Sequence, residues 1–151
     1  MGYIASVLAL TVLLPIVSAL ADCALHHLAP ALAGLKWLTF WACGVRLLLA
    51  GLRQSARPDF TARAIFQISG TEVLPVVREL GFANLAMGLL GTLSLLVAGL
   101  VDAAAIVGGV YYLLAGVQHA LHRPLNAKRK VAMTTDLLVG SALGLLLALT
   151  S

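Results

Sequence analysis

The feature that most constrains this chain is a series of long apolar segments with almost no charge. Residues 80–101 form a run of 22 residues without a charged side chain, and residues 2–21 form another of 20. A helix of about 20 apolar residues crosses roughly 30 Å of bilayer hydrocarbon. Only 11% of the 151 residues are charged, against about 25% in soluble domains. The pattern predicts an all-α, polytopic transmembrane helix bundle.

Five spans in a single domain over residues 1–151 fit the pattern best. The predicted spans are about residues 3–21, 35–52, 80–101, 103–121 and 134–150. Two interpretations of the first span remain open, because Ala19-Leu20-Ala21 has the form of a signal-peptidase site. No basic residue precedes this run, which favours a retained helix; cleavage would leave four spans.

Lys and Arg gather in two predicted loops, residues 53–78 and 122–133. In the first loop, the spacing of Ala62, Ile65 and Phe66 predicts a short interfacial helix. Because cytoplasmic loops are enriched in Lys and Arg, both loops are predicted to be cytoplasmic. The N-terminus is then inside and the C-terminus outside, in a bacterial cytoplasmic membrane. Basic residues beside apolar runs favour anionic membrane lipids as partners over nucleic acid; a homo-oligomer or a larger membrane complex is also open.

Small residues recur at helical spacing within the predicted spans. The third span carries Gly81, Asn84, Gly88 and Gly91 on one face. Similar stripes occur in the fourth span (Gly108, Tyr112, Ala115, His119) and the fifth (Asp136, Gly140, Gly144). Small residues mark the faces where membrane helices approach closely. The stripes therefore predict that Asn84, His119 and Asp136 turn toward the bundle interior.

Five polar side chains are predicted to share the cytoplasmic half of the bundle: Arg46, Glu79, Asn84, His119 and Asp136. Ionisable groups at membrane depth are costly and usually face a partner or a wet cavity. One interpretation is a structural network in which Arg46 neutralises Glu79 or Asp136. The other is a small polar pocket for a ligand or a proton, where a histidine beside carboxylates can titrate.

The sequence contains few signs of catalysis or of a cofactor. His26 and His27 are predicted near the outer surface and His119 and His122 near the inner one, so the two pairs are not expected to share a metal or haem. No phosphate loop, nucleophile elbow or H-E-x-x-H motif occurs. No cofactor is predicted, and enzymatic activity stays open, with a non-enzyme favoured.

Residues 78–85 read Arg-Glu-Leu-Gly-Phe-Ala-Asn-Leu, with Gly88 and Gly91 following. This segment resembles the E-x-G-F-A-N-L-x-x-G-x-x-G signature of a bacterial family of small uncharacterised integral membrane proteins, broadly DoxX-like. Gln118-His119, Asn126 and Asp136 are similar to its later positions, and the resemblance covers roughly residues 37–147. The chain departs from the pattern in its longer Arg-rich stretch before Glu79. The resemblance implies a four- or five-helix bundle and no established reaction.

These observations favour a non-enzymatic membrane protein, either an accessory subunit or a binder of lipid or quinone-like molecules at the polar cluster. Two alternatives come from other classes. One is an oligomeric proton-coupled transporter or channel, in which copies of the chain together supply the pathway. The other is a haem-holding redox subunit, which would need a second chain to supply a facing histidine.

Overall fold

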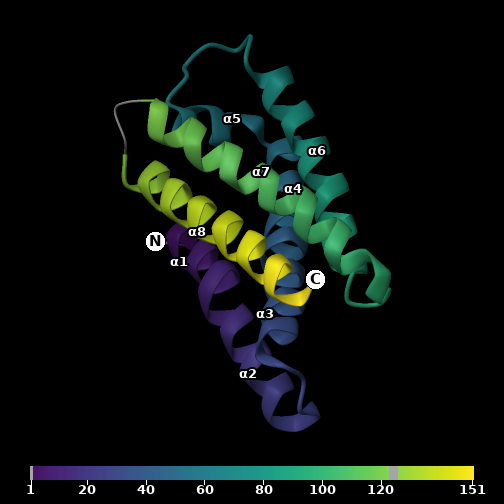
Figure 1. Ribbon diagram of the computed structural model, residues 1–151. Helices are drawn as coiled ribbons and strands as arrows, with labels where there is room; N and C mark the ends of the chain where they lie inside the picture. Colours follow the sequence, from purple (N-terminus) through teal and green to yellow (C-terminus); the bar gives the residue numbers. More distant parts are fainter. Residues whose placement is uncertain (1, 123–125) are drawn as a thin grey trace.

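The computed structural model describes residues 2–122 and 126–151, and within these residues it contains helices and no strand. Five helices are long and apolar enough to cross a membrane. They are Gly2–His26, Pro30–Ala56, Leu74–Leu93, Val101–Leu121 and Ala127–Thr150. Figure 1 shows them packed side by side as an all-α bundle. The predicted fold class and its five candidate spans are confirmed.

The first two helices form a hairpin, and each contains π-helical turns. The first consists of α1 (Gly2–Leu8), η1 (Ala9–Leu13) and α2 (Leu14–His26). The second consists of α3 (Pro30–Leu38), η2 (Thr39–Arg46) and α4 (Leu47–Ala56). His27 ends α2 in the left-handed conformation, with φ of 54°. The second helix begins at Pro30, before the predicted residue 35, because proline suits the first turn of a helix.

A short helix lies in the first basic loop, as predicted, but it begins and ends earlier than the spacing indicated. It consists of α5 (Pro58–Phe60) and the π-helical η3 (Thr61–Phe66). Gln67 ends it in the left-handed conformation, with φ of 63°. Asn126 Nδ2 donates a hydrogen bond of 3.2 Å to the Ala64 carbonyl, which ties the two basic loops together.

The last three long helices are α6 (Leu74–Leu93), α7 (Val101–Leu121) and α8 (Ala127–Thr150), with the one-turn η4 (Ala98–Leu100) before α7. Helix α6 begins and ends earlier in the chain than the predicted third span, residues 80–101. Pro75 opens α6 in its first turn, and the helix ends before Ser94, whose Oγ donates to the Gly91 carbonyl over 2.7 Å. Helix α8 starts before the predicted residue 134 because the Asn126 side chain caps it by accepting from the Arg129 N–H.

The glycine stripe of α6 packs against η2 and α4. A Cβ added at Gly44 would lie 2.8 Å from the Gly91 carbonyl carbon, and one added at Gly51 would lie 2.7 Å from the Gly81 carbonyl oxygen. The two backbones therefore touch, as the stripe predicted. Helix α7 packs along α8, where a Cβ at Gly140 would lie 2.9 Å from the Gly109 carbonyl oxygen. Gly144, in contrast, has open space around it.

Candidate functional site

A buried ion pair joins the second helix to the last. Arg46, the final residue of η2, donates from Nη2 to Asp136 Oδ1 of α8 over 2.7 Å. The two side chains are 11% and 6% exposed. The Arg46 guanidinium also lies over the Tyr112 ring of α7, 4.9 Å from its centroid. Two charges in an apolar interior hold each other in place, because separating them would leave each one uncompensated.

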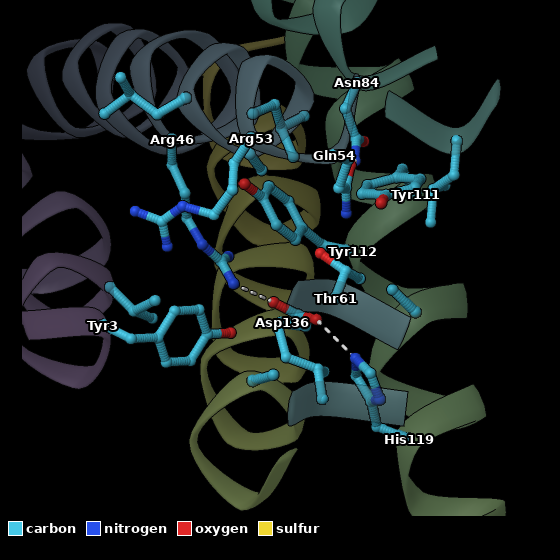
Figure 2. Close-up of a pocket in the computed structure, with 18 of the residues that line it drawn as sticks. Tyr3, Arg46, Arg53, Gln54, Thr61, Asn84, Tyr111, Tyr112, His119 and Asp136 are labelled. Carbon is cyan, nitrogen blue, oxygen red and sulfur yellow. Dashed lines mark hydrogen bonds and ion pairs between the residues drawn. The ribbon is translucent and has the colours of Figure 1, made fainter. Parts of the chain in front are cut away.

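His119 of α7 lies near the second carboxylate oxygen of Asp136. Its Nε2 lies 3.9 Å from Asp136 Oδ2, too far for a hydrogen bond, and its ring lies 6.2 Å from that of Phe66 in η3. Figure 2 shows Asp136 between the Arg46 guanidinium and the His119 ring, with the Tyr3 side chain of α1 pointing toward the pair. The Asp136 carboxylate thus faces the Arg46 guanidinium and the His119 imidazole, which come from different helices.

A second polar contact lining the same region joins α6 to α4. Asn84 is 1% exposed, and its Nδ2 donates to Gln54 Oε1 of α4 over 2.7 Å. Tyr111 of α7 lies beside both amides (Figure 2). The Tyr112 hydroxyl turns the other way and donates to the Ala42 carbonyl over 2.6 Å. Tyr112 thereby belongs to the core, and it also lines the same open space as Tyr111, Asn84 and Arg46.

These polar groups surround one side of a cavity of about 660 Å³. The polar residues that line it are Ser6 and Gln118 and, labelled in Figure 2, Tyr3, Arg46, Arg53, Gln54, Thr61, Asn84, Tyr111, Tyr112, His119 and Asp136. Its remaining wall is apolar and includes Val7, Leu10 and Leu47. Binding sites for small molecules have roughly 300–1,000 Å³ and the same combination of apolar walls with a few polar groups.

Two polar atoms in the cavity wall have no hydrogen-bond partner within the part of the chain that the structure describes. They are Arg46 Nη1, a donor, and Asn84 Oδ1, an acceptor. Buried polar groups are nearly always paired, because an unpaired one loses its hydrogen bonds to water without replacement. Both atoms are fully enclosed by the surrounding helices, so a ligand would reach them only after neighbouring side chains moved.

The structure brings four of the five predicted site residues to this cavity: Arg46, Asn84, His119 and Asp136. Glu79 is exposed on α6 and does not line the cavity, so its predicted place in the cluster was wrong. Five positions separate Glu79 from Asn84, which is about 140° around a helix of 3.6 residues per turn. When Asn84 faces α4, Glu79 therefore points elsewhere, and Arg46 pairs with Asp136 alone.

Sequence reasoning missed several residues of the wall. Gln54 carried a usable signal, because it is an amide in the last turn of the second long helix, where a buried partner for Asn84 would be expected. Tyr112 was on the predicted inner stripe of its helix but had no assigned role. Tyr3 and Phe60 had no signal in the sequence, since their positions depend on how α1 and α5 pack against the other helices.

A separate polar group lies at the far end of the first hairpin, away from the cavity. Asp22 is 6% exposed and accepts from Lys36 Nζ and Trp37 Nε1, both over 2.8 Å. His26 Nδ1 lies 2.7 Å from the same carboxylate. This end of α2 is remote from the C-terminal end of α7, which carries His119 (Figure 1). The two places are therefore distinct, and Asp22 is satisfied within the hairpin that it ties together.

Fold and site together define a class: a helical membrane protein with five candidate spans and a cavity between them. The chain belongs to a family of unknown function, DUF6790, whose profile matches residues 1–151. No curated protein and no solved structure matches the chain. The resemblance to DoxX-like proteins stays a prediction.

Proposed function

We propose that this protein binds an amphipathic small molecule, a lipid or a quinone-like compound, in the cavity beside Arg46, without catalysing a reaction. The observation that carries the proposal is a cavity of about 660 Å³ with an apolar wall and with Arg46, His119 and Asp136 among its polar lining residues. The polar end of the molecule would lie beside these polar side chains, and its apolar part would cover Val7, Leu10 and Leu47. An accessory role in a larger complex is compatible with this binding.

The proposal includes a location and an orientation. We place the protein in a bacterial cytoplasmic membrane, with the N-terminus and both basic loops in the cytoplasm. The cavity lies at the same end of the bundle as these loops, since Tyr3, Arg53 and Phe60 line it together with Arg46. Its ligand would therefore enter from the inner leaflet or from the cytoplasmic surface.

Filling the cavity tests the proposal. Ala115 of α7 lines the cavity, so Ala115→Phe would occupy its volume while leaving every polar group in place. The matched control is Ala103→Phe, an exposed position on the same helix. Native mass spectrometry of protein purified in mild detergent, with a chemical extract of the same sample, would identify any retained molecule.

We expect the wild-type protein and Ala103→Phe to retain the same molecule and Ala115→Phe to lose it. A wild-type chain that carries nothing, or an Ala115→Phe variant that keeps the molecule, would contradict the proposal. The intact mass also reports whether residues 1–21 are present, which the cavity requires because Tyr3 and Val7 line it. A haem band in the absorbance spectrum would instead favour the haem-holding alternative.

A further inference from the structure

A second cavity, of about 530 Å³, adjoins the first at the end that carries the basic loops. The two cavities share three lining residues, Tyr3, Arg53 and Phe60. The second cavity differs in chemistry, because three cationic side chains line it, Arg53, Arg57 and Lys128, and Asp59 is the one carboxylate among its described residues. A cavity with a largely apolar wall thus lies beside one with a positive net charge.

The cations are arranged around a single aromatic ring. Arg53 of α4 lies 5.2 Å from the centroid of Phe60, and Lys128 of α8 lies 5.1 Å from it. Neither cation, nor Arg57, forms an ion pair within residues 2–122 and 126–151. The ring therefore holds two positive charges from different helices near each other while their hydrogen-bonding groups stay free for an anion.

We infer that the ligand is a phosphate-bearing lipid, with its phosphate at Arg53, Arg57 and Lys128 and an acyl chain in the apolar cavity. This inference rests on the proposed function and names its ligand class. Arginine forks match the oxygens of a phosphate, and a charge-assisted hydrogen bond is about twice as strong as a neutral one. A carboxylate would use the same cations, but three cations in one site match the three free oxygens and the higher charge that a phosphate can offer, and the adjacent apolar cavity suits an acyl chain.

The distance between the two sites fits one lipid molecule. Arg46 and Arg53 are seven residues apart in one continuous helix, which is about 10 Å at 1.5 Å per residue. When the phosphate lies at Arg53, the glycerol backbone would lie toward Arg46, which lines the apolar cavity one step further along the helix. The acyl chain then lies against Val7, Leu10 and Leu47. The phosphate would thus lie among cations and the acyl chain among apolar side chains.

The test compares three probes on the purified full-length protein: phosphatidylglycerol, the diacylglycerol with the same acyl chains, and inorganic phosphate. The variant is Arg53→Gln combined with Lys128→Gln. The matched control is Arg63→Gln, which removes an exposed arginine of the same loop region that lines neither cavity. Delipidated protein is titrated with each probe, and binding is followed by native mass spectrometry.

We expect the wild-type protein to bind phosphatidylglycerol about tenfold or more tightly than diacylglycerol, because the phosphate adds charge-assisted hydrogen bonds. The double variant should lose this preference and Arg63→Gln should keep it. Inorganic phosphate that binds as tightly as phosphatidylglycerol would overturn the inference, since the acyl chain would then contribute nothing. A preference that survives in the double variant, or is lost equally in Arg63→Gln, would also overturn it.

The proposed function can stand when this inference fails. If Ala115→Phe releases the native molecule but the wild-type protein does not prefer phosphatidylglycerol to diacylglycerol, the cavity binds another amphipathic compound. If Ala115→Phe binds phosphatidylglycerol as well as the wild type does, the phosphate site works without the cavity, and the placement of the acyl chain is wrong.

Discussion

At the scale of single residues, the Arg46–Asp136 contact matters most for stability, because both charged side chains are largely buried. Breaking a buried ion pair on one side costs about 3–5 kcal/mol, since the remaining charge has no counterion. We therefore predict that Asp136→Asn lowers the free energy of unfolding by an amount in this range. The measurement is reversible unfolding in mixed detergent micelles, followed by circular dichroism.

Two further variants make this prediction specific. Asp102→Asn removes an exposed carboxylate from the first turn of α7 and should leave stability nearly unchanged. Arg46→Met combined with Asp136→Leu removes both charges and should recover most of the loss, because apolar residues replace the pair without an orphaned ion. If Asp136→Asn is as stable as the wild type, the two charges do not depend on each other.

At the scale of helices, the contact of η2 with α6 depends on residues that lack a side chain. A Cβ at Gly44 would lie 2.8 Å from backbone atoms of Gly91 and Thr92, which cannot move aside as a flexible side chain can. We predict that Gly44→Ala destabilises the protein by about 1–3 kcal/mol through overpacking. This loss exceeds the gain of about 1 kcal/mol that alanine usually brings to a helix interior.

The matched control for this prediction is Gly144→Ala in α8, where an added Cβ meets nothing within 4 Å. This variant should be neutral or slightly stabilising, because only the helix propensity changes. Unfolding in the same micelles compares the two directly. Equal effects at Gly44 and Gly144 would show that the close approach of η2 and α6 does not limit stability.

At the scale of the whole molecule, the proposed orientation places the loop between η3 and α6 inside the cell and the turn between α6 and α7 outside. We predict that a membrane-impermeant maleimide labels Gly99→Cys in intact cells and labels Thr71→Cys only after permeabilisation. Both positions are exposed, and Cys23 and Cys43 would be replaced by alanine beforehand. The reverse pattern would put the cavity, and therefore its ligand, in the outer half of the membrane.

Local information was sufficient for much of this architecture. Apolar runs of spanning length predicted five helices, and the Gly81–Gly91 stripe predicted which face of α6 packs closely, because hydropathy and residue size act over adjacent turns. Helix ends were less predictable. Pro30, Pro75 and the Asn126 cap shift three of them by several residues, since polar caps and prolines can extend a helix beyond its apolar run.

The sequence by itself therefore determined that the chain forms a five-helix bundle with basic loops at one end and polar residues on inward faces. Only the tertiary structure decided which of these residues meet. Arg46 pairs with Asp136, 90 residues away, while Glu79 points out of the cluster. The physical reason is rotational: side-chain partners depend on how each helix turns about its axis. The π-helical turns before Arg46 and the packing of neighbouring helices set that rotation, and no local pattern in the sequence specifies it.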